Sequence, residues 1–373
     1  MIVIYKRNRH AEIRLYAVYS LIFFTFGLVW ACHPSKKAEI SIRWTDKRAT
    51  GISIPKQLLQ SVSSDSLGQF LAVRLAGKET AIAGNYQSIG KSIVFEPLIP
   101  FTRGLTYGVW LKDNQLGEMT IPDLAPGDTP TLLAIYPTQD SLPDNLLKIY
   151  LHFSRPMREG QSQNYVSLVR NYTDTLPGVF LNLQPELWNA DRTMLTLWLD
   201  PGRIKRDLQP NKRLGAPLLA GVHYELVVSA AWPDQQGARL MKKTIKPFVT
   251  VPRDSLSPVP AKWTLSQPQS GSVSPLEVAF GEPLDYNLLT ETLHVLTESG
   301  KPVSGKWQPG NEEKQSSFKP NEAWQAGTYR LRIEGRQEDL AGNNLNRPFD
   351  RDITRKDRAV TNDPFVEVLF KIR

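Results

Sequence analysis

A unit of about 100 residues recurs three times after Cys32, and this repeat constrains the fold more than any other feature of the sequence. In each copy a strand-like run ends in proline two residues after a large apolar residue. Further along, each copy has a glycine and then a tyrosine that opens an alternating strand. The three copies read Phe95-Glu96-Pro97 with Gly104 and Tyr107, Leu199-Asp200-Pro201 with Gly221 and Tyr224, and Phe318-Lys319-Pro320 with Gly327 and Tyr329.

The strand opened by each tyrosine has the period of a half-buried β-strand. The tyrosine and the second and fourth residues after it share one face, because successive side chains point to opposite faces of a sheet. An aspartate and a glycine follow each strand, at Asp113 and Gly117, Asp234 and Gly237, and Asp339 and Gly342. Aspartate can accept hydrogen bonds in an Asx-turn and glycine can adopt positive φ, so these pairs predict hairpin loops.

The placement of the tyrosine, shortly after a proline or glycine corner, resembles the tyrosine corner of immunoglobulin-like (Ig-like) and fibronectin type III sandwiches. The segments 136–157 and 338–343 extend the resemblance to the bacterial Ig-like domains described from S-layer proteins. It is fullest over about residues 130 to 355 and weaker over 38 to 125. The resemblance implies an all-β tandem array of three Ig-like antiparallel β-sandwiches. It implies no reaction, because this fold hosts many functions.

Proline-rich linkers divide the chain at residues 122–130 and 252–260, and both are too rich in proline to be flexible. We therefore expect domains at 38–125, at 130–253 with a basic insertion, and at 258–373 with a C-terminal strand.

The N-terminal segment looks like a targeting signal. Four basic residues precede an uncharged run over 15–31, and the run ends at the only cysteine, Cys32. Val29 and Ala31 resemble positions minus three and minus one of the lipobox of a bacterial lipoprotein. The resemblance implies a signal peptide at 1–31, lipidation of Cys32, a tether at 32–37 and sorting to the outer membrane, since aspartate does not follow the cysteine. An uncleaved signal anchor is the alternative.

Composition excludes several classes of function. One cysteine rules out an intramolecular disulfide framework and a thiolate-rich zinc site. Loss of residues 1–31 removes four basic residues and one acidic residue, which lowers the formal charge from +8 to +5. This excess is small for the chain length and does not indicate nucleic-acid binding.

Two motifs that suggest a ligand have simpler explanations. Gly84 to Ser92 resembles a phosphate loop, but the glycine spacing and the strand that follows predict a hairpin. Asp234, Asp339 and Asn343 suggest calcium, but their spacing is too sparse for a recognised loop and favours turns. We therefore predict no cofactor, no metal and no catalytic residues.

The middle copy carries the candidate ligand or partner surface. Strand alternation points Trp198, Tyr150 and His152 away from the apolar face, and Trp188 is ambiguous. Exposed aromatics can stack on sugars or anchor a protein partner, and packing against a neighbouring domain is the alternative. The insertion at 202–215 could bind an anionic group, with a solvated loop as the alternative. Its basic residues are Arg203, Lys205, Arg206, Lys212 and Arg213.

These observations predict a lipid-anchored cell-envelope protein that acts as a non-catalytic structural or protein-interaction module. Its expected partners are the membrane, through lipid at Cys32, and an envelope protein. The alternative function is a ligand-binding lipoprotein for polysaccharide or another anionic envelope component.

Overall fold

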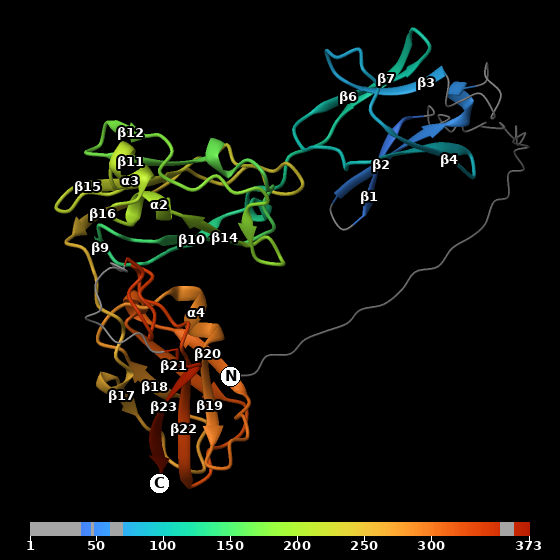
Figure 1. Ribbon diagram of the computed structural model, residues 1–373. Coiled ribbons are helices and arrows are strands. Elements are labelled where there is room, and N and C mark those ends of the chain that lie inside the picture. The colour runs from blue at the N-terminus through green and yellow to red at the C-terminus, as the bar shows by residue number, and fades with distance from the viewer. Residues whose placement is uncertain (1–38, 46–47, 60–69, 351–361) are drawn as a thin grey trace, which may run out of the picture. The chain divides into compact units, whose positions relative to one another are not determined.

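Figure 1 shows a computed structural model of the chain, which describes residues 39–45, 48–59, 70–350 and 362–373. Cys32 and the predicted signal peptide lie outside these residues, so cleavage and lipidation stay predictions. The longest α-helices of the described residues, α3 (Gln209–Leu214) and α4 (Tyr286–Glu291), have six residues each. In this part of the chain no helix has the length and apolar character needed to cross a bilayer.

The described strands form six sheets that lie in three pairs, and each pair encloses its own cluster of buried apolar side chains. We call them the first, second and third sheet pairs, in chain order. Neighbouring strands are antiparallel, apart from one parallel pairing in the second sheet pair. This is the all-β, Ig-like sandwich fold that the sequence predicts. The predicted domain boundaries stay predictions.

The bounds of the strands follow the order of each sheet. The first sheet pair contains β1 (Ser41–Thr45), β2 (Arg48–Pro55), β5 (Ser92–Pro97) and β4 (Gly84–Ile89), with β3 (Leu71–Leu75), β6 (Thr106–Leu111) and β7 (Asn114–Thr120) in its other sheet. The second contains β13 (Leu187–Trp188), β14 (Met194–Trp198), β10 (Lys148–Phe153) and β8 (Leu132–Tyr136), with β12 (Asp174–Leu176), β11 (Val166–Arg170), β15 (His223–Val228), β16 (Thr244–Val251) and β9 (Ser141–Pro143). The third contains β17 (Thr264–Ser266), β18 (Leu276–Ala279), β21 (Gln315–Pro320) and β20 (Gly305–Pro309), with β19 (Leu293–Thr297), β22 (Gly327–Glu334) and β23 (Phe365–Ile372).

The predicted C-terminal strand is confirmed. β23 pairs with β22 along its whole length, from Phe365 opposite Glu334 to Ile372 opposite Gly327. Phe370 and Ile372 are buried in the third core, as the alternation of this segment requires.

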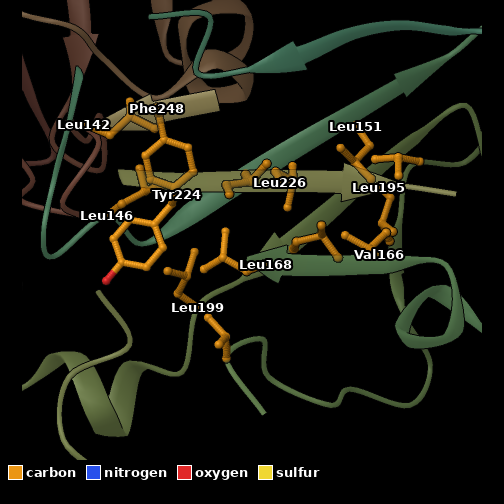
Figure 2. Close-up of a cluster of buried hydrophobic side chains, with 14 of the residues drawn as sticks. Leu142, Leu146, Leu151, Val166, Leu168, Leu195, Leu199, Tyr224, Leu226 and Phe248 are labelled. Atoms are coloured by element: carbon orange, nitrogen blue, oxygen red, sulfur yellow. The ribbon is translucent and has the colours of Figure 1, made fainter. Parts of the chain in front are cut away.

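The core of the second sheet pair shows how the alternating residues are used (Figure 2). Leu151 and Leu195 come from one sheet, and Leu168 and Leu226 come from the other. All four are nearly fully buried, because every second residue of a strand faces the opposite sheet.

Each sheet pair contains a tyrosine corner, as the sequence predicts. Tyr107 and Tyr224 each accept a hydrogen bond from the backbone N–H five residues earlier, at 3.0 and 2.9 Å. Tyr329 donates to the backbone carbonyl four residues earlier, at 3.0 Å. The three rings are buried, so each hydroxyl ties a connecting segment to a core strand.

Two of the three predicted turns are confirmed. The carboxylates of Asp234 and Asp339 each accept hydrogen bonds from the backbone N–H groups two and four residues later, at 2.8 and 2.9 Å. The hairpin predicted at Asp113 is present, with Lys112 and Asp113 between the paired residues Leu111 and Asn114, but Gly117 is not part of its turn, because it lies inside β7 opposite Val109. Lys112 closes that turn with a φ of 53°, so no glycine is needed there.

The segment from Gly84 to Ser92 is the predicted hairpin. β4 and β5 are antiparallel neighbours, and Ile89 pairs with Ser92 across a two-residue turn. The geometry is that of a strand, not of a loop that leads into a helix, so it does not offer a phosphate site.

We expect Tyr224→Phe to lower the free energy of unfolding by about 1 kcal/mol, because the backbone N–H of Leu219 loses its acceptor. Urea unfolding measures the change. Tyr172→Phe is the control, because Tyr172 is exposed at the tip of a hairpin and should change stability little. Equal losses of unfolding free energy for the two variants would show that the hydrogen bond between Leu219 and Tyr224 does not stabilise the fold.

Candidate functional site

Charged and aromatic side chains of the second and third sheet pairs meet at one junction. Lys148 and Tyr150 come from β10, Asp285 precedes α4, and Glu338 follows β22. Asp285 is placed by its role as the N-cap of α4, where its carboxylate accepts a hydrogen bond from the backbone N–H of Leu288 at 3.2 Å.

Lys148 is the cation of this junction. Its Nζ lies 3.2 Å from Asp285 Oδ2 and 2.6 Å from Glu338 Oε2. The Tyr150 hydroxyl donates to the same Asp285 carboxylate, at 2.7 to 2.8 Å from its two oxygens. Asp285 is only 4% exposed, so these contacts form with little access for water.

The electrostatics of the junction are consistent with this geometry. Burial lowers the pKa of Lys148, but the carboxylates of Asp285 and Glu338 outweigh it and raise the pKa above its ordinary value. Burial, and then the charge of Asp285, raise the pKa of the Tyr150 phenol. Lys148 therefore stays charged and Tyr150 stays a hydrogen-bond donor at neutral pH.

Further contacts join the same two sheet pairs beside this ion pair. The rings of Tyr136 and Tyr286 stack with centroids 3.5 Å apart and planes 12° apart. The carboxylate of Glu313 accepts hydrogen bonds from the backbone N–H and the hydroxyl of Thr138, at 2.9 and 3.0 Å. Glu313 is 1% exposed, and burial raises the pKa of its carboxyl group. The second and third sheet pairs are therefore joined by directional hydrogen bonds as well as by ring packing.

The turn that follows β22 packs into the core of the second sheet pair. The backbone N–H of Leu147 donates to the carbonyl of Leu340 at 2.9 Å, and Leu340 belongs to the second core cluster. Gly342 has a φ of 80°, and a Cβ there would lie 2.4 Å from Leu147 Cδ2. Glycine is required at this position for both its backbone conformation and the close approach of Leu147.

The junction is filled by its own side chains. A cavity of about 10 Å³, lined in part by Tyr150, Asp285 and Tyr286, has room for one water molecule at most. The hydroxyl of Tyr150 and the charge of Lys148 are both satisfied by groups of the protein. The arrangement can hold two sheet pairs together, and it leaves no space for a substrate.

The expectation that Tyr150 is exposed is wrong. Tyr150 is 4% exposed because the third sheet pair covers its face of β10. Trp198 is half-buried, with its ring centroid 5.6 Å from Lys148 Nζ, and His152 is half-buried too. For Tyr150, the alternative of packing against a neighbouring module is therefore the correct one.

Trp188 is held against the second core. Its Nε1–H donates to Glu186 Oε2 at 2.8 Å, and its ring lies 6.0 Å from that of Trp232. It is half-buried, so it offers only part of a stacking surface.

The basic insertion folds as α2 (Pro201–Ile204) and α3, and three of its five basic side chains contact protein groups. Arg203 donates to the backbone carbonyls of Gly178 and Gly215, at 2.9 and 3.0 Å. Lys205 Nζ lies 4.2 Å from the ring centroid of Phe349, and Arg206 Nε lies 3.0 Å from Asp350 Oδ2.

Three basic residues of the insertion are exposed to solvent, and one of them, Arg206, also pairs with Asp350. Lys212 lies 4.0 Å from Asp207, in an exposed contact of little strength, and Arg213 is exposed. Some of the basic side chains of the insertion thus pack against the protein, and the role of the insertion in binding an anion stays a prediction.

One group of carboxylates has oxygens close enough to share a cation. Single oxygens of Asp254, Glu282 and Asp339 lie within 4.8 Å of one another. Both oxygens of Asp339 already accept hydrogen bonds, from Ala341 and Asn343. We assign no metal to this group.

Sequence reasoning missed the acidic partners of the junction. Asp285 has a local signal, because aspartate before a short helical stretch is a common N-cap. Glu338 and Glu313 have none, because their partners are more than 170 residues away in the chain.

Comparisons with known proteins bear only on likeness of fold. No protein-family model and no curated protein matches the sequence. Solved structures that match include alpha-2-macroglobulin of Escherichia coli over domains MG0-NIE-MG1, with 13% identity, 66% of this chain and 72% of that chain covered, and a TM-score of 0.23. The N-terminal part of the bacterial S-layer protein SbsC matches with 12% identity over 66% of this chain and 45% of that chain, also with a TM-score of 0.23. This chain thus spans less than half of that fragment, and likeness at this level carries no argument about function.

We expect Lys148→Met to lower the free energy of unfolding by about 3 kcal/mol, because it leaves two largely buried carboxylates without their cation. Urea unfolding followed by tryptophan fluorescence measures the loss. Adding Asp285→Asn and Glu338→Gln to Lys148→Met should recover part of it. Lys319→Met is the matched control, since Lys319 is exposed on β21 and forms no ion pair among the described residues. A loss for Lys148→Met as small as that of the control would contradict the role of the ion pair.

We expect the protein to become less stable as pH rises from about 4 to about 8, through Asp339. Burial raises the pKa of Asp339 from 3.8 to about 8, so between these values the folded state binds a proton that the unfolded state releases. The contribution of Asp339 to the free energy of unfolding is fully present below the pKa that Asp339 has in the unfolded state. It is lost as pH rises to the pKa that Asp339 has in the folded state. The slope from this group is at most about 1.4 kcal/mol per pH unit. Unfolding free energies across this range should show a shallower decline in Asp339→Asn, and an unchanged slope would refute the assignment.

Proposed function

We propose that the chain is a lipid-anchored cell-envelope protein whose Ig-like sandwiches act as a non-catalytic structural or protein-interaction module. The observation that carries the proposal is the junction of Lys148, Tyr150, Asp285 and Glu338. There, the buried ionisable side chains form ion pairs and a hydrogen bond with one another. The cavity beside them has space for one water molecule at most.

The junction is suited to fixing one arrangement of two sheet pairs. A buried ion pair is a weak source of net stability, because removing both charges from water offsets most of their attraction. Its hydrogen bonds are directional, however, so they form only when the second and third sheet pairs meet in one relative position. The Tyr136–Tyr286 stack and the Glu313–Thr138 hydrogen bonds require the same position. A module that presents binding surfaces at a set spacing needs this property.

The anchor in this proposal is lipid on Cys32, with residues 32–37 as the tether. Acyl chains hold a protein to a bilayer with about 0.8 kcal/mol per buried methylene, so several chains give stable attachment. The outer membrane is the proposed location, because the residue after Cys32 is histidine and not aspartate.

We expect Cys32→Ala to abolish incorporation of labelled palmitate and to move the protein from the membrane fraction to the soluble fraction. The label is specific, because the chain has one cysteine. Ser35→Ala, three residues away, is the control and should change neither result. Retention of Cys32→Ala in the membrane would instead support the uncleaved signal anchor.

The same strains test the interaction. In-cell crosslinking and mass spectrometry should recover one envelope protein from the wild type and lose it from Cys32→Ala. Recovery of background proteins alone from a correctly lipidated wild type would contradict the interaction module.

A further inference from the structure

The C-terminal strand β23 is the outer strand of its sheet, which has the order β19-β22-β23 (Figure 1). It pairs with β22 over all eight residues without a register shift, and no other strand of the described residues pairs with it. The outer edge of such a strand presents unpaired backbone N–H and C=O groups, which are able to bond to a further strand.

The pairing with β22 shows which residues of β23 face the open edge. The backbone N–H of Gly335 donates to the carbonyl of Pro364 at 2.8 Å, so these opposed residues form a hydrogen-bonded pair just before β23. Hydrogen-bonded pairs alternate with non-bonded pairs in an antiparallel ladder, so the even-numbered residues of β23 bond to β22. The odd-numbered residues therefore point their N–H and C=O groups to the open edge. The carbonyl of Arg373 faces the same way, and it accepts from the backbone N–H of Ser270 at 2.9 Å.

The open edge of β23 lacks the structural features that usually prevent strand addition. Most other edge strands of the described sheets are very short, end in proline or pair through a register shift. β12, β13 and β17 have three residues or fewer, β9 and β20 end in proline, and β1, β7 and β8 pair through register shifts. No hydrogen bond from another described residue reaches the backbone of Glu367, Leu369 or Lys371 at the open edge.

The side chains at this edge are complementary to a second copy of themselves. Glu367, Leu369 and Lys371 lie on the face opposite the third core, and Leu369 is 67% exposed. When two copies of β23 pair antiparallel about a two-fold axis at Leu369, Glu367 of each copy lies opposite Lys371 of the other, and Leu369 lies opposite itself. All three pairs join residues whose N–H and C=O groups face the edge. The backbone hydrogen bonds and the side-chain pairs therefore require the same register.

The two charged side chains of the edge differ in their contacts within the chain. Lys371 is exposed and forms no ion pair among the described residues. Glu367 Oε1 accepts from Arg332 Nε at 2.9 Å, and Glu367 Oε2 lies 3.6 Å from Arg330 Nη1. Both arginines belong to β22, on the side of Glu367 away from the open edge, and the Glu367 side chain is still 24% exposed. The contact with Lys371 of a second copy selects the register, while backbone hydrogen bonds and apolar contact supply most of the binding.

We propose that β23 pairs with β23 of a second copy of the chain, antiparallel and centred on Leu369, so that two three-stranded sheets join into one sheet of six strands. The pairing also covers Val366 and Val368, which lie on the core side of β23 and are half-buried in one copy. A two-fold contact of this kind uses the same surface on both copies, so it closes as a dimer and does not propagate into a fibre.

This partner is additional to the envelope protein proposed above. The edge belongs to the folded chain with or without lipid at Cys32, so loss of the anchor does not remove the dimer. A monomeric chain, in turn, leaves the anchored module standing.

Sedimentation of the full chain in detergent, over a series of concentrations, tests dimerisation. We expect a monomer–dimer equilibrium for the wild type. Leu369→Pro removes an N–H that faces the open edge and keeps the hydrogen bonds to β22, so it should weaken the dimer at least tenfold. Leu369→Lys places two like charges at the two-fold axis and should weaken it as much. Val273→Lys, at a valine that is 50% exposed between β17 and β18, is the matched control and should dimerise within twofold of the wild type. A wild type that stays monomeric, or dimers equally stable in all four proteins, would overturn the proposal.

Disulfide formation tests the register. In a Cys32→Ala background, Leu369→Cys carries the only thiol. The two-fold axis brings position 369 of the two copies to about 5.5 Å between Cα atoms, which a disulfide can span. Phe365→Cys is the control, because Phe365 is 42% exposed on the same face but lies eight residues from its counterpart in this register, about 27 Å away. Mild oxidation should link Leu369→Cys into dimers at least tenfold faster than Phe365→Cys, and equal rates would refute the pairing about Leu369.

Discussion

The contact of Lys148 with Asp285 and Glu338 is the interaction on which the rest of the molecule depends. A lysine that is 13% exposed must keep two carboxylates close, because an unpaired charge in this position is costly. That requirement fixes the side of β10 that meets the third sheet pair. It also explains why Tyr150, on the same strand, donates to Asp285 and is not available as a surface residue.

The Asp–Gly turns after the tyrosine strands of the second and third sheet pairs serve as contact elements as well as connections. Gly342 lies against Leu147, and a Cβ at Gly237 would lie 2.5 Å from Thr102 Cγ2. In both cases the turn of one sheet pair reaches residues of the pair before it in the chain. The Asx hydrogen bonds stiffen each turn, so a repeated local motif also produces a repeated kind of junction.

The parts of the fold that local chemistry determines could be predicted from the sequence. A tyrosine followed by alternating apolar residues defines a buried strand face, and this made Tyr107, Tyr224 and Tyr329 identifiable. The hairpin before Ser92 was identifiable because its turn depends only on neighbouring residues. The junction could not be predicted in the same way. Alternation shows that Tyr150 faces away from the leucines, but it does not show which segment covers that face. Arg206 has the same limitation, since its partner Asp350 is 144 residues away.

The two contacts between sheet pairs differ in how their charged groups are matched. At Lys148 the charges of one sheet pair meet opposite charges of the next, and the remaining space holds one water molecule at most. Between the first and second sheet pairs, Arg48 donates to the neutral amide of Gln235 at 3.0 Å. Burial lowers the pKa of Arg103 in the same region, and the nearby charges of Asp234, Asp123 and Asp128 oppose that shift. The basic insertion, for which the sequence allows either an anion site or a solvated loop, uses Arg203 to hold two backbone carbonyls and Arg206 to pair with Asp350, so part of its charge has a structural role that the sequence does not reveal.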